Sequence, residues 1–279
     1  RLCVIGGGVI GLELASYFNS IGTEVSVVEM LDHIAGETDQ DLVALLKADL
    51  EKKGIRFELN ARVTAVTPQG VRYEQAGEDK LIEADKVLLS IGRRANTRDL
   101  GLDSLNVQVE RGAVITDDRM RTNVPDVYAA GDVNGRSMLA HTAYREAEVA
   151  VNNILGHEDI MRYEAIPAVL YTNPEIASVG ETEATADRRN LPYRKVQLPM
   201  KFSGRYQAEN EGGRGIMKLL VDPQTERVLG AHLLSNYASE FIVLVSTFLK
   251  AGLTLAQIKK IVFPHPTVSE IIREAVFQY

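Results

Sequence analysis

The first 60 residues combine short apolar runs with two stretches of helical spacing. The apolar runs at Leu2–Ile5, Glu24–Glu29 and Ile55–Leu59 are typical of buried strands. Between them, Val9–Ile21 and Asp39–Lys53 have the apolar spacing of helices, and each is followed by a glycine that can end a helix. The order strand, helix, strand, helix, strand predicts the first half of a doubly wound parallel sheet.

The pattern changes after residue 60. From Ala61 to Ala84, short alternating segments are separated by Gly70 and Gly77, which predicts a small antiparallel meander. The apolar segment 86–92, "KVLLSIG", then predicts a return to a buried strand. The chain should therefore begin with a Rossmann-like α/β domain that carries a meander.

The second half of the chain predicts a different mixture of elements. Residues 143–155 have helical spacing, and strands are expected within 165–180 and at 194–198, 215–221 and 227–234, followed by helices. The stretch 240–249, "EFIVLVSTFL", is apolar all round, which predicts a helix buried in a domain or between subunits. We expect a separate α+β domain here.

Composition excludes several classes of function. The chain has 279 residues and a formal net charge of −7, and its few basic pairs form no stripe that could bind nucleic acid. The longest apolar run, residues 241–245, is far too short to span a membrane, so we expect no membrane partner. Cys3 is the only cysteine and reads as a buried core residue. No internal disulfide can form, and five histidines without ligand spacing predict no metal site.

Gly6, Gly8 and Gly11 fit the pattern G-x-G-x-x-G between a predicted strand and a predicted helix. Such glycines let the backbone approach a pyrophosphate held at the N-terminus of the helix. Glu29 ends the next strand 18 residues after Gly11, near the expected offset of about 20 for an acid that binds a ribose 2′-hydroxyl. The alternative, a glycine turn that serves only packing, does not account for the complete unit.

The charge around Glu29 favours NAD over NADP. A carboxylate at this position would repel a 2′-phosphate, and residues 30–32 supply no arginine to bind one. Arg93 and Arg94 are candidates to border the NAD pocket, with a solvated loop as the alternative. His33, His157 and His232 show no partner pattern.

Two further segments could carry chemistry. In "TNVPDVYAAGD", residues 122–132, Asp132 follows a short apolar strand, where it could meet a ligand hydroxyl or simply mark a turn. In "FPHPTVSE", His265 stands between two prolines, and Glu270 could orient the ring and raise its basicity. Glu270 could equally complete a capping box with Thr267 at the start of a helix near that residue.

Several segments together resemble dihydrolipoamide dehydrogenases, within the pyridine nucleotide-disulfide oxidoreductases. They are "GGGVIGLELA", "VSVVEMLDHI", "LLSIGRRANT", "VPDVYAAGD", "MLAH", "AVLYTNPEIASVGETE" and "FPHPTVSE", and they extend over essentially the whole chain. Related glutathione and mercuric reductases share the architecture, but they use NADPH and usually carry basic residues where "VEMLDH" stands.

The resemblance implies a homodimeric FAD enzyme that reoxidises dihydrolipoyl groups with NAD. Its partners would be lipoyl carrier proteins of 2-oxoacid dehydrogenase or glycine cleavage complexes. His265 matches the base that handles the thiol proton, and Glu270 matches its orienting carboxylate. Asp132 matches a residue that holds FAD, Leu139, Ala140 and His141 match the helix end that faces the flavin ring, and Gly92 lies in a matching cofactor segment.

The resemblance also implies three domains: an NAD-binding domain at 1–95, a remnant of the FAD-binding domain at 96–160, and a dimerisation domain at 161–279. The family places a first glycine motif and a Cys-x4-Cys disulfide ahead of the NAD motif, and neither occurs in this sequence. We therefore expect the C-terminal part of a longer, cytoplasmic reductase that is inactive alone. The alternatives are a non-catalytic NAD-binding and dimerisation module, or a related flavoprotein disulfide reductase.

Overall fold

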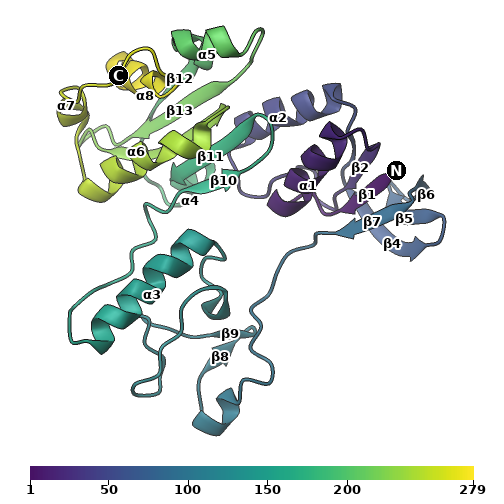
Figure 1. Ribbon diagram of the computed structural model, residues 1–279, viewed down its shortest axis with the longest axis horizontal. Coiled ribbons are helices and arrows are strands. Elements are labelled where there is room, and N and C mark those ends of the chain that lie inside the picture. Colours follow the sequence, from purple (N-terminus) through teal and green to yellow (C-terminus); the bar gives the residue numbers. More distant parts are fainter. The chain divides into compact units, whose positions relative to one another are not determined.

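The computed structural model describes all 279 residues, which form two compact units. Residues 1–91 and 164–279 form the first unit, and residues 92–163 form the second (Figure 1). The predicted division into three domains at residues 95/96 and 160/161 stays a prediction. None of the helices is long and apolar enough to cross a membrane.

The first unit begins with a parallel sheet of four strands in the order β3-β2-β1-β7. Helices α1 and α2 connect its first three strands, which confirms the predicted β-α-β-α-β order. One face of β1 and β2 packs against apolar side chains of both helices, including Leu12 and Leu46. The elements are β1 (Leu2–Ile5), α1 (Val9–Ser20), β2 (Val25–Val28), α2 (Gln40–Lys52), β3 (Arg56–Glu58) and β7 (Lys86–Leu89).

The predicted meander covers the other face of the parallel sheet. It has three antiparallel strands, β4 (Ala61–Thr67), β5 (Gly70–Gln75) and β6 (Glu78–Glu83). Cys3 and Ile5 of β1 pack there against Val71 and Tyr73 of β5. Cys3 is fully buried, as expected, and burial raises the pKa of its thiol to about 11. This cysteine is therefore a neutral core residue.

The rest of the first unit is an antiparallel sheet of five strands in the order β10-β11-β14-β13-β12. Helices α6 and α8 pack on one face of it, around a core that includes Met217, Leu219 and Val245. This is the expected α+β domain. Its elements are β10 (Ala168–Leu170), β11 (Glu175–Gly180), α4 (Glu183–Arg188), β12 (Arg194–Pro199), η3 (Met200–Phe202), α5 (Gly204–Glu209), β13 (Ile216–Val221), β14 (Val228–Ser235), α6 (Ala238–Ala251), α7 (Leu255–Ile258) and α8 (Glu270–Gln278).

Helices α6 and α8 refine the sequence expectation. Within this chain helix α6 is buried on one face, while Val243 stays 54% exposed, so its burial between subunits stays a prediction. Helix α8 begins at Glu270, not near Thr267, because the chain bends at residues 265–266 and turns at 268–269, and His265 lies back against the first residue of the helix. The exposed apolar residues of α6 leave a face that another chain could cover.

The two sheets of the first unit share an apolar contact. Leu170 of β10, Ile176 of β11 and Leu234 of β14 join the cluster that contains the helical face of the parallel sheet. Glu13 of α1 also accepts a hydrogen bond from the backbone N–H of Tyr171 at 2.9 Å. Residues far apart in sequence therefore form one compact body.

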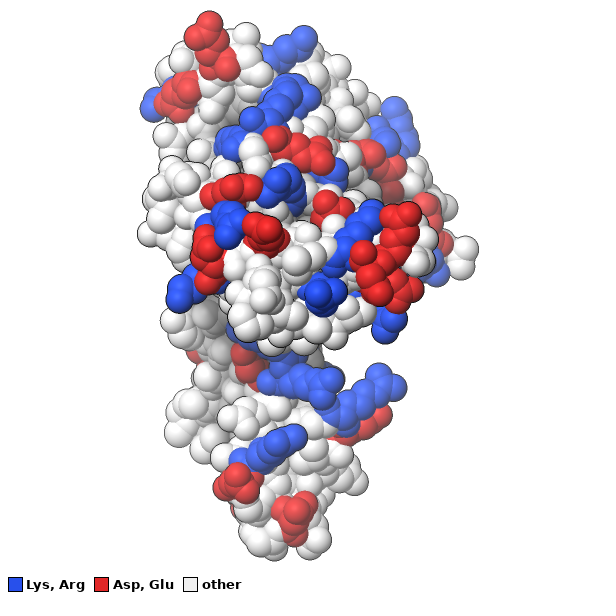
Figure 2. All heavy atoms as spheres, turned by 90° about the vertical axis from the view of Figure 1, so that its right-hand side faces the viewer, with Lys and Arg blue, Asp and Glu red and all other residues white.

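Charged side chains of both signs are interspersed on the face of the first unit in the upper part of Figure 2. Oppositely charged side chains of the first unit form close pairs, such as Arg62 with Glu74, at 2.5 Å, and Arg1 with Asp85. Such exposed pairs contribute little to stability, and they produce no extended basic surface on this face.

The second unit contains one long helix and several short elements. Helix α3 spans Ala140–Ile154 and begins three residues earlier than predicted. The other elements are η1 (Leu102–Leu105), the hairpin β8 (Val109–Glu110) and β9 (Ala113–Val114), and η2 (Asp132–Asn134). Its core is small and includes Val107, Val114 and Ala129.

Candidate functional site

The glycine turn joins β1 to α1, and two of its glycines are required by close backbone approach. Gly6 has φ of +103°, and a Cβ there would lie 2.2 Å from the carbonyl oxygen of Ser90. A Cβ on Gly11 would lie 2.2 Å from the carbonyl oxygen of Gly6. Residues 6 and 11 must therefore be glycine for the strand, the turn and the helix to pack.

Gly8 has a different reason to be glycine. Its φ of −74° suits any residue, and no atom lies within 4 Å of where its Cβ would be. Gly8 is the N-cap of the 12-residue helix α1 and provides no side chain to cap it. An anion can therefore approach the N-terminus of α1 closely, where N–H groups and the helix dipole favour negative charge.

Glu29 lies beside this turn, at the end of β2. Its Oε2 accepts a hydrogen bond from the N–H of Gly7 at 2.7 Å, and its Oε1 accepts one from the N–H of Leu31 at 2.8 Å. These two contacts fix the carboxylate against the turn. Each oxygen retains a further lone pair, so the group can still accept hydrogen bonds from sugar hydroxyls. The four residues Gly6, Gly8, Gly11 and Glu29 thus come together as the sequence predicted.

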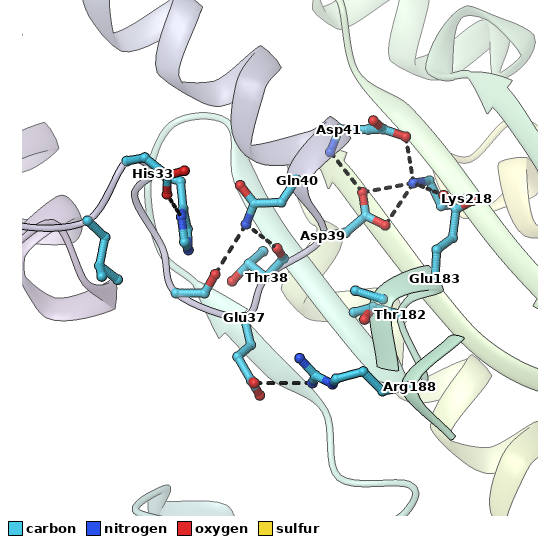
Figure 3. A pocket seen from close by; sticks show the side chains of 14 residues that line it. His33, Glu37, Thr38, Asp39, Gln40, Asp41, Thr182, Glu183, Arg188 and Lys218 are labelled. Atoms are coloured by element: carbon cyan, nitrogen blue, oxygen red, sulfur yellow. Dashed lines mark hydrogen bonds and ion pairs between the residues drawn. The ribbon is translucent and has the colours of Figure 1, made fainter. Parts of the chain in front are cut away.

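A loop, residues 30–38, leaves Glu29 and returns to the glycine turn. The N–H of Ala35 donates to the carbonyl oxygen of Gly7 at 2.8 Å, and Ile34 is buried beside Gly7. The loop borders a cavity of about 680 Å³ that continues to α2, α4 and β13 (Figure 3). No pattern in residues 30–38 indicates that this loop braces the turn.

A charged cluster around the buried Lys218 forms one wall of that cavity. We call it the Lys218 cluster, and it consists of Lys218, Asp39, Asp41 and Glu183. Nζ of Lys218 lies 2.7 Å from Oδ2 of Asp39, 2.7 Å from Oδ2 of Asp41 and 2.5 Å from Oε1 of Glu183 (Figure 3). The Lys218 side chain is 1% exposed. Burial opposes its charge, but the three carboxylates outweigh burial and raise its pKa. Sequence analysis missed this cluster, although a lysine inside the apolar run "GIMKLLV" was the available signal.

The second unit holds the remaining residues expected to bind a cofactor. Asp132 opens η2, and its side chain is 49% exposed. Leu139 is the N-cap of α3, without a side-chain capping bond, and Ala140 and His141 are the first residues of that helix. Both Asp132 and the start of α3 can therefore offer hydrogen bonds to a polar ligand.

Arg93 organises these residues within the second unit. Its Nη2 donates to the carbonyl oxygen of Met138 at 2.6 Å, and its Nη1 lies 3.5 Å from Oδ2 of Asp132. Arg93 is thus fixed against Asp132, and the expectation that it borders an NAD pocket stays a prediction. Gly92, just before it, has φ of +104° and is exposed.

Glu146 of α3 is a buried residue that sequence analysis missed. Its Oε2 accepts hydrogen bonds from the N–H of Gly131 at 2.6 Å and from Nδ2 of Asn134 at 2.8 Å. Its Oε1 accepts a hydrogen bond from the hydroxyl of Tyr163 at 2.7 Å. Burial, followed by this bond, raises the pKa of Tyr163 to about 12. Glu146 therefore holds the Gly131–Asp132 segment against α3.

His265 and Glu270 are in direct contact. Nδ1 of His265 lies 2.6 Å from Oε1 of Glu270, while Oε2 accepts a hydrogen bond from the N–H of Thr267 at 2.9 Å. Burial opposes ionisation of Glu270, but these two contacts outweigh burial and lower its pKa. The imidazole is 78% exposed. The pair can therefore present an exposed imidazole, oriented by Glu270, to a ligand or a second chain.

Two other histidines, His33 and His232, have local partners. Nδ1 of His33 lies 2.5 Å from Oδ1 of Asp32. His232 is fully buried, and its Nε2 lies 2.8 Å from the carbonyl oxygen of Glu181. Burial lowers the pKa of His232, which keeps the ring neutral. In the structure, no three His, Cys, Asp or Glu side chains are grouped so that they could hold a metal ion.

Comparisons with known proteins agree with this architecture. Residues 1–147 match the family described as pyridine nucleotide-disulphide oxidoreductase, and residues 166–276 match the dimerisation domain of that family. A dihydrolipoyl dehydrogenase of Chlamydia pneumoniae is 38% identical over 275 residues, which are 98% of this chain and 59% of that protein.

Solved structures show the same similarity. LpdA from Mycobacterium tuberculosis superimposes with a TM-score of 0.91 at 29% identity, over 99% of this chain and 61% of LpdA. The flavoprotein disulfide reductase RclA from Escherichia coli superimposes with a TM-score of 0.88 at 28% identity, over 99% of this chain and 64% of RclA. The chain thus spans about three fifths of the length of the proteins it matches.

Proposed function

The chain belongs to the pyridine nucleotide-disulphide oxidoreductase family, and from this premise we propose that it is the NAD-binding and dimerisation part of an NAD-dependent dihydrolipoyl dehydrogenase. Proteins of this family generally bind FAD and NAD(P). The proposed activity is the reoxidation of dihydrolipoyl groups on carrier proteins of 2-oxoacid dehydrogenase or glycine cleavage complexes. The observation that carries the proposal is the contact of Glu29 with the Gly6–Gly11 turn.

The residues of the turn fit a dinucleotide without a 2′-phosphate. The open space at Gly8 accommodates the pyrophosphate at the N-terminus of α1, and Glu29 accepts hydrogen bonds from the adenosine ribose. A phosphate on that ribose would lie against the same carboxylate, and the exposed residues Met30 and Leu31 offer no cation. NAD is therefore the proposed nucleotide.

The second unit contains residues that fit part of a flavin site. A half-exposed carboxylate at Asp132 suits a hydroxyl-bearing chain such as ribitol, and Leu139, Ala140 and His141 place the start of α3 for the flavin ring. FAD would supply the transfer of electrons between dithiol and NAD. The 279 residues contain one cysteine, Cys3, which is buried, so the redox disulfide is proposed to lie on residues outside them.

The dimerisation part is proposed to bring His265 and Glu270 to the site of the other subunit. Glu270 would stabilise the imidazolium, and His265 would hold the proton released by the thiol of the substrate. The exposed ring is consistent with a role that a second chain completes. The proposed domains are NAD-binding at 1–95, FAD-binding at 96–160 and dimerisation at 161–279, and a cytoplasmic location stays a prediction.

Turnover tests the activity directly. The full-length protein should reduce NAD with dihydrolipoamide, whereas the 279 residues alone should bind NADH without turnover. A full-length protein that reduces glutathione disulfide with NADPH, and does not oxidise dihydrolipoamide, would assign the chain to a related disulfide reductase instead. Sedimentation should give a dimer, and a monomer would contradict the role of His265 across an interface.

A further inference from the structure

The Lys218 cluster joins the five-stranded sheet to the start of α2, directly after the loop that braces the glycine turn. We propose that Lys218 is a positioning residue for dinucleotide binding, because through Asp39 it fixes the loop 30–38 that supports Gly7 and Glu29. This inference rests on the proposed NAD site. If Lys218 has this role, the affinity of the proposed NAD site depends on a residue of the dimerisation part of the chain.

The position of Lys218 on its strand explains why it can reach α2. Strand β13 is covered on both faces: Met217, Leu219 and Val221 point into the core beneath α6 and α8. Lys218 alternates with them and points to the opposite face, where the N-terminus of α2 lies (Figure 3). Strand β13 therefore packs into the core beneath α6 and α8 with one face, and with the other face it contacts the start of α2 through Lys218.

Asp39 links the anchor to the loop. It is the N-cap of α2, and its Oδ1 accepts hydrogen bonds from the N–H of Asp41 at 3.1 Å and of Leu42 at 3.4 Å. Both of its oxygens also contact Lys218, at 2.9 and 2.7 Å. One carboxylate thus fixes the start of the helix and ties it to β13.

The loop is held at both of its ends and in the middle. Glu29 binds the N–H of Leu31 at one end, and Asp39 anchors the other end. In the middle, the N–H of Ala35 donates to Gly7. Release of the Asp39 end would free the loop to move, and the glycine turn would lose the packing of Ile34 beside Gly7.

Within the cluster, Lys218 and Asp39 form a buried ion pair, with side chains that are 1% and 3% exposed. Removing two or more charges from water is costly, so buried ion pairs are retained only with close geometry and matched partners. The contacts of Lys218 satisfy this condition with three carboxylates. If the contact between β13 and the start of α2 needed only packing, an apolar side chain at position 218 would stabilise it at least as well as the lysine does.

Two variants weaken the anchor in graded steps. Asp39→Asn keeps an N-cap side chain but removes the charge that meets Lys218. Asp41→Asn removes the outer carboxylate, whose side chain is 57% exposed, so this variant should fold even if the first does not. The matched control is Arg214→Gln, which removes another charged contact with α2, to Asp49, at the far end of that helix.

The experiment measures the dissociation constant of NADH and amide hydrogen exchange at Leu31 and Ala35 in the nucleotide-free, intact protein. We expect Asp39→Asn to raise the dissociation constant on the order of tenfold and to speed exchange at Ala35. Asp41→Asn should have a smaller effect in the same direction, and Arg214→Gln should change neither quantity. The proposal would be overturned if Asp39→Asn and Asp41→Asn had the same NADH dissociation constant and the same exchange rates as the wild type.

The two measurements separate this inference from the proposed function. If the wild-type protein binds no dinucleotide, the NAD site is wrong, while exchange at Ala35 still reports whether Lys218 anchors the loop. If the wild-type protein binds NADH and the charge variants bind it equally well, the NAD site stands and the positioning role of Lys218 fails.

Discussion

Nδ1 of His265 lies 2.6 Å from Oε1 of Glu270. The other oxygen of the same carboxylate accepts the N–H of Thr267, so Glu270 both orients the ring and satisfies one backbone donor. The sequence left these two roles as alternatives. The hydroxyl of Thr267 donates to the carbonyl oxygen of Pro264, and helix α8 begins without a side-chain capping bond, so the reciprocal half of a capping box is not formed.

Replacing His265 should affect turnover and leave stability unchanged. In the full-length enzyme, His265→Gln should lower kcat with dihydrolipoamide by about 10²- to 10⁴-fold, the usual range for loss of a general base. The thermal midpoint should not move, because the ring is 78% exposed. Steady-state kinetics and thermal unfolding check this, and unchanged kcat would remove His265 from the site.

Glu270→Gln separates the two contacts of the carboxylate. Glutamine can still accept the N–H of Thr267, but it cannot stabilise a charged imidazole, a contact worth about 1.5–3 kcal/mol. We expect kcat with dihydrolipoamide to fall by about tenfold or more, because the imidazole loses the carboxylate that orients it and stabilises its charged form. Wild-type kinetics in this variant would leave Glu270 with a structural role only.

Replacing Gly8 or Gly11 with alanine should separate the role of the turn in packing from its role in nucleotide binding. Gly8→Ala places a methyl group in open space, so stability should stay as in the wild type while NADH binding weakens by roughly tenfold or more. Gly11→Ala brings the methyl against the carbonyl oxygen of Gly6 and should lower the free energy of unfolding by about 1–3 kcal/mol. If Gly8→Ala binds NADH normally, the pyrophosphate does not lie at this turn.

The Lys218 cluster should make stability depend on pH in acid and in strong base. Contact with Lys218 lowers the pKa of Asp41, and in Glu183 the contacts with Lys218 and Lys195 outweigh burial and lower the pKa. Their contribution is present above the unfolded values near 4 and is lost as pH falls through the lower folded values. The raised pKa of Lys218 keeps its contribution fully present below pH 10.5.

The double variant Asp41→Asn/Glu183→Gln isolates this effect. Asp41 is more than half exposed, so after a discount for solvent screening the loss should be about 1–2 kcal/mol between pH 6 and 8. The difference from the wild type should begin to shrink below about pH 4, near the unfolded values, and should disappear as pH falls through the lower folded values, where the folded wild-type carboxylates become protonated. Urea unfolding at several pH values measures it, and a difference that is constant from pH 3 to 8 would contradict the account.

The elements that rest on local patterns could be predicted from the sequence. Strand β1 and the meander follow from apolar runs and from glycines that need positive φ, and Gly6, Gly11 and Glu29 follow from the spacing of a known motif. These features depend on residues close in the chain or on one strand-helix unit. Their prediction therefore required no knowledge of how the two sheets of the first unit pack.

The features that could not be predicted depend on residues far apart in sequence. Lys218 meets Asp39 across 179 positions, and no local pattern indicates which carboxylate a strand lysine will face. Glu146 likewise meets Gly131 and Tyr163, 15 and 17 positions away, only in the folded second unit. The early start of α3 was missed because residues 140–142, Ala-His-Thr, carry no strong capping signal.

The preference of the protein for NADH over NADPH tests the central claim most directly. Fluorescence titration of the wild-type protein and of Glu29→Gln with each nucleotide measures four dissociation constants. We predict that the wild type binds NADH more tightly than NADPH and that Glu29→Gln narrows the difference, since the repulsive charge is gone. Tighter binding of NADPH by the wild type, or no binding of either nucleotide, would contradict the assignment of Glu29 and the glycine turn to NAD.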